Sequence, residues 1–279
     1  MNQLKQRRLL ERLLLEDIGD RDLTSEAIFP AYQTGKGVFI AKETGIIAGL
    51  PIIKEAYSLL DSSIEVNYLI SEGEKISSHE PIAEVRGPIL HLLSGERVIL
   101  NLLQRMSGIA TLTNLSVKTL NDPTIQLCDT RKTTPGLSMF EKYAVRIGGG
   151  KNHRSGLYDG VLIKDNHISF CGSITNAVTA VRKQIGHTLK VEVEVETKAQ
   201  VLEAVSIGAD IIMLDNCRPD KVKQFTKLIP QTIITEASGG ITLRNLHDYK
   251  NTGVDYISLG YLTHSVKALD ISLNIQTTD

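Results

Sequence analysis

Side chains able to bind anions follow a run of three glycines in the middle of the chain. Glycines 148–150 precede Lys151, His153 and Arg154, and Lys164 follows the short apolar run 161–163. Three successive glycines fit poorly into a helix or strand, because glycine loses more conformational freedom on folding than any other residue. An irregular backbone beside clustered cations predicts a pocket for a strongly negative ligand.

Positive charge is concentrated around this stretch in a chain that is slightly acidic as a whole. Residues 129–167 contain seven Lys or Arg against four Asp or Glu, whereas the formal net charge of the chain is −1. A general nucleic-acid binder is usually more basic than this. The pattern favours a small anionic ligand, and we expect no nucleic-acid partner.

Composition predicts a globular protein of one or two domains. The 279 residues are 42% hydrophobic and 23% charged, which is ordinary for such a chain. Cys128, Cys171 and Cys217 are far apart and form no CxxC pair, so we expect no disulfide framework, no zinc site and a reducing, cytoplasmic compartment. The N-terminus lacks the apolar core of a signal peptide, and no apolar run is long enough for a membrane span.

The N-terminal part has short β-like runs between helical segments. Helical spacing indicates helices at 4–17, 51–60, 92–106 and 109–120, with a break at Ser107-Gly108; strands are expected at 36–41, 45–49, 64–68 and 81–85. Residues 71–85 resemble half of a biotinyl or lipoyl carrier domain. Because the second half is missing, we favour an ordinary β-hairpin over a non-enzymatic carrier.

The C-terminal part alternates strands and helices, which predicts parallel strands joined by crossovers. Apolar runs at 125–128, 160–163, 189–195, 211–214, 233–236 and 256–259 are expected to be strands, with helices at 174–185, 198–207, 219–228 and 242–250. A complete (β/α)₈ barrel takes roughly 250 residues. We therefore expect a truncated barrel or an open parallel sheet.

Polar residues follow each of these predicted strands, where parallel α/β proteins bind their ligands. Three glutamates, Glu192, Glu194 and Glu196, alternate along one strand and should share one face. Glu194 is the best candidate to meet the cations, whereas Glu192 and Glu196 could equally end in solvent or in structural ion pairs. Asp215 could hold a ribose hydroxyl or Mg²⁺, or cap a helix.

Three further positions have alternative interpretations. Ser238-Gly239-Gly240 lies between a predicted strand and helix, where bare backbone N–H groups bind phosphate well, although a simple glycine turn is the alternative. His153 stands among cations and could meet a carboxylate. For His167 we favour a structural role at a turn.

The motifs together resemble the quinolinate phosphoribosyltransferase family over nearly the whole chain. The matching segments are Glu96-Arg97 and the stretches 103–111, 129–136, 148–154, 162–167, 214–216, 238–240 and 262–265. The resemblance implies an α/β fold, with an N-terminal open-faced α/β sandwich at 1–108 and an incomplete α/β barrel of parallel strands at 109–266. We expect the tail 267–279 to pack on the sandwich.

The resemblance also implies roles for individual residues. Arg97, Arg131, His153 and Arg154 match binders of the quinolinate carboxylates, with Arg97 reaching across a homodimer interface into a shared site. Lys132 and Lys164 match lysines that face phosphoribosyl diphosphate, and Glu194 and Asp215 match carboxylates near the ribose and a largely substrate-bound Mg²⁺. We take these last four as catalytic. The remaining substrate-binding residues match phosphate loops: Ser238, Gly239, Gly240, Ser258, Leu259 and Gly260.

The implied reaction joins quinolinate to phosphoribosyl with loss of CO₂, giving nicotinate mononucleotide and diphosphate in de novo NAD biosynthesis. Both substrates are strongly negative, in agreement with the clustered cations. The alternative is a paralogue of the family that acts on another ring acid or is linked to molybdate transport.

Overall fold

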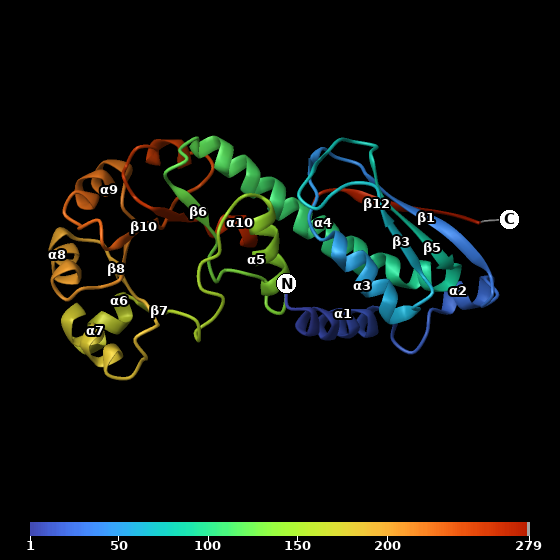
Figure 1. Ribbon diagram of the computed structural model, residues 1–279, viewed down its shortest axis with the longest axis horizontal. Coiled ribbons are helices and arrows are strands. Elements are labelled where there is room, and N and C mark those ends of the chain that lie inside the picture. Colours follow the sequence, from blue (N-terminus) through green and yellow to red (C-terminus); the bar gives the residue numbers. More distant parts are fainter. Residues whose placement is uncertain (278–279) are drawn as a thin grey trace. The chain divides into compact units, whose positions relative to one another are not determined.

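The computed structural model describes residues 1–277, which divide into two compact units (Figure 1). The first unit comprises residues 1–114, 134–149 and the described residues from 265 onward; the second comprises 115–133 and 150–264. This division differs from the boundary expected at 108/109, since 109–114 and 134–149 belong to the first unit. Among the described helices, none is long and apolar enough to cross a membrane.

The first unit contains a four-stranded antiparallel sheet. Its strands, in order, are β12 (Ile271–Thr277), β1 (Thr34–Ala41), β5 (Pro81–Pro88) and β3 (Glu65–Tyr68). Buried side chains alternate with more exposed ones along β1, as expected for a strand with one covered face. The C-terminal strand β12 pairs with β1, so residues 271–277 belong to this sheet; positions 278–279 of the expected tail lie outside the described residues.

Helices accompany this sheet in the first unit (Figure 1). They are α1 (Gln3–Ile18), α2 (Leu23–Ile28), α3 (Leu50–Leu60) and the first part of α4 (Ile89–Leu120). The Glu72 carboxylate accepts the N–H groups of Gly49 and Leu50 at 2.7 and 2.9 Å and so caps α3. The short strands β2 (Gly45–Ile46) and β4 (Lys75–Ile76) pair with each other. Residues 71–85 are therefore not a simple hairpin, because β4 pairs with β2 whereas β5 pairs with β1 and β3.

The break predicted at Ser107-Gly108 is wrong, since α4 runs without interruption from Ile89 to Leu120. Gly108 is present for a different physical reason. A Cβ at this position would collide with the backbone carbonyl oxygen of Lys267. Glycine therefore allows the C-terminal segment to pass directly against the helix.

Helix α5 (Ser138–Ile147), which sequence patterns did not indicate, also belongs to the first unit. Its Glu141 is 1% exposed and accepts a hydrogen bond from Arg105 Nε of α4 at 2.7 Å. A buried carboxylate needs such a partner. Gly148 then ends the helix and Gly149 has a φ of +96°, which a residue with a side chain rarely adopts.

The second unit is built on a six-stranded parallel sheet, as predicted. Its order is β6 (Gln126–Cys128), β11 (Tyr256–Ser258), β10 (Ile234–Ser238), β9 (Ile211–Asp215), β8 (Val191–Val195) and β7 (Val161–Ile163). All six expected strands are present, each within two residues of its predicted bounds. Five α-helices accompany them: α6 (Asp165–Cys171), α7 (Ile174–Arg182), α8 (Lys198–Ser206), α9 (Pro219–Thr226) and α10 (Tyr261–His264).

The helix expected at 242–250 is wrong. Here the chain forms a turn in which Asn245 Oδ1 accepts the Thr242 N–H at 2.7 Å, followed by the short 3₁₀ helix η1 (Leu246–Tyr249). Asn and Thr side chains offer the backbone such local hydrogen bonds in competition with a helix. The glycines at 239–240 therefore do not lie at the start of an α-helix.

Candidate functional site

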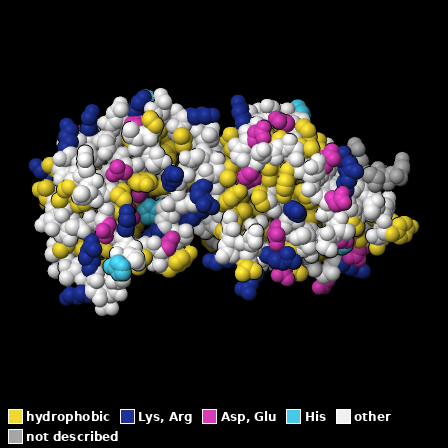
Figure 2. Space-filling view, in the orientation of Figure 1, with side chains coloured by type: hydrophobic (Ala, Val, Ile, Leu, Met, Phe, Trp, Pro, Cys, Tyr) yellow, Lys and Arg dark blue, Asp and Glu magenta, His cyan; other side chains and the backbone are white. Residues whose placement is uncertain are grey.

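A cavity of about 410 Å³ opens in the second unit where the parallel strands end. It brings together most of the residues that the sequence singled out, and all of its lining residues belong to this unit. In Figure 2, basic, acidic and histidine side chains gather on the visible face of this unit. The lining is formed by Thr130, Arg131, Lys132, His153, Arg154, Leu162, Lys164, Glu194, Met213, Asp215, Asn216, Ser238, Gly239, Gly240 and Ser258.

Cations outnumber carboxylates in this lining. Arg131, Lys132, Arg154 and Lys164 face only Glu194 and Asp215 among the charged side chains. Burial and the neighbouring Arg131 guanidinium lower the pKa of Arg154, which shows how closely the positive charges are placed. An anionic ligand would relieve this repulsion, so the cavity suits a ligand with several negative groups.

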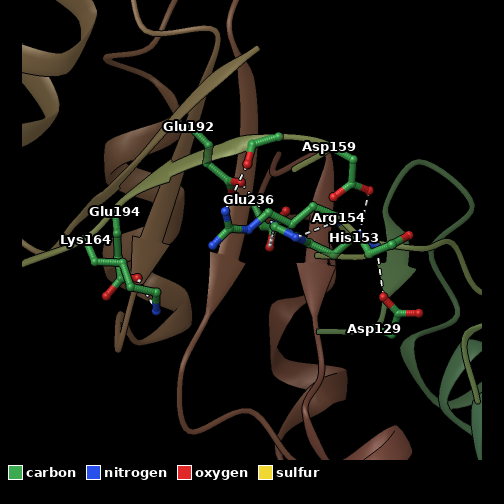
Figure 3. Close-up of polar contacts among 10 residues, drawn as sticks. Asp129, His153, Arg154, Asp159, Lys164, Glu192, Glu194 and Glu236 are labelled. Carbon is green, nitrogen blue, oxygen red and sulfur yellow. Dashed lines mark hydrogen bonds and ion pairs between the residues drawn. The ribbon is translucent and has the colours of Figure 1, made fainter. Parts of the chain in front are cut away.

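Asp129 holds the loop that follows glycines 148–150 to the end of β6. This carboxylate is fully buried; Oδ1 accepts the backbone N–H of His153 at 2.9 Å, and Oδ2 accepts the side-chain amide of Asn152 at 2.6 Å (Figure 3). Lys151 also forms a parallel bridge with Cys128. The loop is thus ordered as an extension of the sheet edge, and His153 and Arg154 are placed in the cavity wall.

Both ring nitrogens of His153 are already engaged. Nδ1 accepts the backbone N–H of Arg154 at 2.8 Å, and Nε2 lies 3.1 Å from Glu192 Oε2. Arg154 is fixed in turn by Nη1, which donates to the Gly160 carbonyl at 2.9 Å. His153 therefore contacts its protein neighbours through both nitrogens, rather than presenting a free imidazole N–H to the cavity.

Lys164 and Glu194 form an ion pair across the ends of neighbouring strands. Lys164 follows β7, Glu194 lies in β8, and the Nζ–Oε2 distance is 3.1 Å (Figure 3). Burial raises the pKa of Glu194, and the hydrogen bond from Lys164 opposes this shift. His167 caps helix α6, its Nδ1 accepting the Lys164 N–H at 2.9 Å, so the structural role predicted for His167 is confirmed.

Asp215 and the turn 238–240 lie in close contact at the ends of β9 and β10. A Cβ on Gly239 would lie 2.7 Å from Asp215 Oδ1 and would collide with the Asn216 side chain, and its φ is +81°. Glycine is therefore required both for the backbone conformation and for the close approach. Burial, and next the charge of Glu196, raise the pKa of Asp215, which makes a nearby cation favourable.

Three predicted residues are not part of this lining. Leu259 is fully buried and its N–H donates to the Cys128 carbonyl at 2.9 Å, so it is not available to a phosphate. Gly260 lies next to Lys132, since a Cβ there would be 3.0 Å from Lys132 Cδ. Arg97 lies on α4 in the first unit with its side chain 60% exposed, and its nearest acidic partner is Glu96 at 3.8 Å.

Two buried glutamates were not selected from the sequence as site residues. Glu192 of β8 and Glu236 of β10 lie against His153, at 3.1 and 3.6 Å from Nε2. The alternation of Glu192 with buried valines was the available signal, because it puts Glu192 and Glu194 on the same face of the strand. Glu236 lay at the end of a predicted strand, and nothing in its local pattern marked it.

Comparison with protein families covers both units. Residues 22–107 match the family model for the N-terminal domain of quinolinate phosphoribosyl transferase, and residues 109–274 match that for its C-terminal domain. The chain belongs to this family. The fold predicted from the resemblance, an α/β sandwich with an incomplete barrel, is confirmed by the sheets and by the solved structures of relatives.

Individual relatives are similar over almost their whole length. The chain is 56% identical to the probable nicotinate-nucleotide pyrophosphorylase (carboxylating) of Bacillus subtilis, covering 99% of this chain and 95% of the relative. It is 41% identical to quinolinate phosphoribosyltransferase (decarboxylating) 1 of Nicotiana glauca, covering 96% and 82%. The structure of NadC from Streptococcus pyogenes superimposes with a TM-score of 0.96 at 39% identity, covering 100% of this chain and 99% of that chain.

Proposed function

We propose that the protein transfers phosphoribosyl from phosphoribosyl diphosphate to quinolinate and releases CO₂, giving nicotinate mononucleotide and diphosphate. The observation that carries this proposal is that four Lys or Arg side chains and two carboxylates line one shared cavity. Membership of the family and the names of the relatives from Bacillus subtilis and Nicotiana glauca support the same reaction.

The two halves of the cavity suit the two substrates. Arg131 and Arg154 offer guanidinium groups to the two carboxylates of quinolinate, a pairing that can be bidentate. Lys132, Lys164 and the turn 238–240 offer cations and a glycine-rich backbone to phosphate and diphosphate groups. His153, held by Asp129 and Glu192, supports the guanidinium side.

The reaction proceeds through positioning and electrostatic stabilisation. The ring nitrogen of quinolinate forms a bond to the anomeric carbon while the bond from that carbon to diphosphate breaks, which develops positive charge on the ribose. Glu194 and Asp215 stabilise this charge, and Lys132 and Lys164 stabilise the departing diphosphate. The bond to the adjacent carboxylate then breaks, its electrons pass to the pyridinium ring, and a proton takes the place of CO₂.

We propose Mg²⁺ as the cofactor, held mainly by the diphosphate with Glu194 and Asp215 nearby. The residues fit a hard cation: both carboxylates line the cavity, and carboxylate oxygens are the ligands that Mg²⁺ prefers. When bound, the ion supplies charge neutralisation for the leaving diphosphate. Glu194 and Asp215 orient the ribose and its cation, while the lysines hold the phosphates.

We further propose a homodimer in which Arg97 of each subunit completes the partner's site. The exposed side chain of Arg97 and its loose pairing with Glu96 support a role outside its own unit. The distribution of cysteines and the composition support a cytoplasmic location. Mass measurement in solution and cell fractionation test these two points separately.

The reaction is tested by measuring diphosphate release with phosphoribosyl diphosphate, Mg²⁺ and one of three acceptors: quinolinate, nicotinate or another ring acid. We expect release only with quinolinate. Turnover with nicotinate, or with another ring acid in preference to quinolinate, would replace the proposal with the paralogue alternative. A Lys164→Ala variant purified in the same way should release diphosphate roughly 30-fold more slowly, which distinguishes the enzyme from contaminating activity.

A further inference from the structure

A buried acidic pair lies directly against His153, outside the group of residues assigned to substrates. The side chains of Glu192 and Glu236 are 5% and 6% exposed, and that of His153 is 12% exposed. One ligand atom from each of the three lies within 4.8 Å of those of the other two. Figure 3 shows both glutamates near the 153–154 segment, apart from the Lys164–Glu194 pair.

The hydrogen bonds fix which nitrogen of His153 carries its proton. Nδ1 accepts the backbone N–H of Arg154, so this nitrogen bears no hydrogen. The neutral ring then carries its hydrogen on Nε2, which lies 3.1 Å from Glu192 Oε2. The ring thus links the buried glutamate to the backbone of Arg154.

The pair has more negative charge than its surroundings compensate. Oε1 of each glutamate and Nε of Arg154 are buried without a hydrogen-bond partner among the described residues. Burial and then the charge of Glu192 raise the pKa of Glu236, against the influence of His153 and Ser258, while Asp129 adds to the rise. Two buried carboxylates beside one imidazole need hydrogen-bond donors, and the Nε2–H group of His153 is the donor that lies nearest to both.

We propose that Glu192 and Glu236 are positioning residues that hold the Nε2–H group of His153, which in turn fixes the Arg154 backbone in the cavity wall. This inference rests on the proposed function in one respect, because it takes Arg154 as a binder of a quinolinate carboxylate. The chain of contacts runs from the glutamates through the imidazole to the Arg154 backbone, whose guanidinium is fixed separately on the Gly160 carbonyl.

His153, Glu192 and Glu236 are residue types that also bind metal ions. The observations favour a hydrogen bond from His153 Nε2 to Glu192 over a metal ion at this place. Arg154, whose guanidinium shares this environment and whose pKa responds to Glu192, already supplies a positive charge there. The separation of 3.1 Å between Nε2 and Oε2 suits a direct hydrogen bond. Metal binding is therefore an outcome that would contradict the proposal.

The kinetic test uses Glu192→Ala, which removes the acceptor, and Glu192→Gln, which keeps an acceptor oxygen. We expect Glu192→Ala to raise the KM for quinolinate by about tenfold or more, since a buried hydrogen bond to a charged group is lost, with little change in the KM for phosphoribosyl diphosphate. Glu192→Gln should recover most of the affinity. The double variant Glu192→Ala/His153→Asn should be no worse than the more impaired single variant, because both changes interrupt one chain of contacts.

Glu203→Gln is the matched control, since this carboxylate on α8 accepts from Thr175, outside the cavity. Equal rises in both KM values, or additive losses in the double variant, would contradict a positioning role through His153. So would a stoichiometric metal ion in the purified enzyme whose removal abolishes activity and whose binding requires Glu192 and Glu236.

A second measurement does not depend on turnover. Long-range ¹H–¹⁵N correlation spectra of histidine side chains report the tautomer directly, and His153→Asn assigns the signal. We expect the Nε2–H tautomer in all three proteins, because Nδ1 accepts the Arg154 N–H, with a hydrogen-bonded Nε2–H in the wild type and in Glu192→Gln and loss of that hydrogen bond in Glu192→Ala. If the wild type shows this tautomer but does not turn over quinolinate, the proposed function fails while the positioning inference stands; an Nδ1–H tautomer in the wild type would overturn the inference alone.

Discussion

Lys164 Nζ lies 3.1 Å from Glu194 Oε2, and this ion pair joins the cationic and acidic sides of the cavity. The lysine side chain is 49% exposed, whereas that of the glutamate is 13% exposed. Glu194 is thus removed from water yet keeps a cation beside it. The cation opposes the rise in pKa that burial causes, which favours the ionised form that can stabilise positive charge developing on a ribose.

Replacing Lys164 with Ala should reduce kcat/KM by roughly 30-fold or more, since a charge-assisted hydrogen bond contributes about 2 kcal/mol. Without the lysine, the already raised pKa of Glu194 should rise further, because the cation favours the ionised form. The acidic limb of the pH–rate profile should therefore move to higher pH. Lys183→Ala, an exposed lysine after α7, is the control. An unchanged acidic limb in Lys164→Ala would contradict the assignment.

Gly239→Ala should impair catalysis far more than a positive φ alone explains. The added methyl group would collide with Asn216 and approach Asp215 Oδ1 to 2.7 Å, so the turn or the carboxylate must move. Gly208→Ala is the matched control, because its φ of +69° imposes similar strain, about 1–2 kcal/mol, with no atom within 4 Å of the new Cβ. Both variants should lose some thermal stability, and only Gly239→Ala should lose most of its activity. Equal activities in the two variants would contradict the close-approach argument.

Asp215→Asn should raise the Mg²⁺ concentration needed for half-maximal rate, by about tenfold, since a carboxylate near the ion is replaced by a neutral group. The pKa of Asp215 is raised by burial first, and the ionised form is the one that attracts the cation. Mg²⁺ titration of initial rates measures the effect. Asp220→Asn, on the surface of α9, should behave as the wild type. Equal Mg²⁺ dependence in all three proteins would remove Asp215 from the cation's surroundings.

The stability of Glu236→Gln should depend less on pH than that of the wild type. The pKa of Glu236 is raised from 4.5 to about 7 in the folded state. A carboxyl with a raised folded pKa stabilises the protein most below its ordinary pKa, and this contribution is lost as pH rises through the folded value. The melting temperature of the wild type should therefore contain a fall between about pH 4.5 and 7 that Glu236→Gln lacks. Glu203→Gln should retain the wild-type profile, and identical profiles for Glu236→Gln and the wild type would refute the expectation.

Mixing two impaired variants should restore activity if the site is shared between subunits. Arg97→Ala and Lys164→Ala damage different units of the chain, so a hybrid dimer has one site with both residues intact. Recovery of up to about one quarter of wild-type activity is expected for random exchange of such subunits. Exchange is verified by mass spectrometry of differently tagged chains. Absence of recovery in verified hybrids would argue for self-contained subunits.

The parallel sheet was predictable because its strands are apolar runs separated by helical patterns. Strands β8 and β9 agree closely with the patterns at 189–195 and 211–214. The break in α4 was mistaken because Gly108 has a purpose that only tertiary contact reveals, the passage of residue 267 against the helix. The missing helix after Gly240 reflects local Thr242–Asn245 hydrogen bonds that compete with helix formation.

For the site, local sequence identified residues at strand ends but not their pairing. Lys164, Glu194 and Asp215 stood out as charges that follow or end apolar runs. Glu236 did not, because its importance arises from Glu192 and His153, which are 44 and 83 positions away in the sequence. Such a pairing depends on the order of strands in the sheet, which periodicity alone does not specify.

The most direct test of the proposed reaction uses quinolinate labelled in the carboxylate next to the ring nitrogen, with phosphoribosyl diphosphate and Mg²⁺. We predict one labelled CO₂ released for each nicotinate mononucleotide and each diphosphate formed, and no product from nicotinate under the same conditions. Formation of a nucleotide that retains the label, or turnover of nicotinate without CO₂ release from quinolinate, would contradict the account.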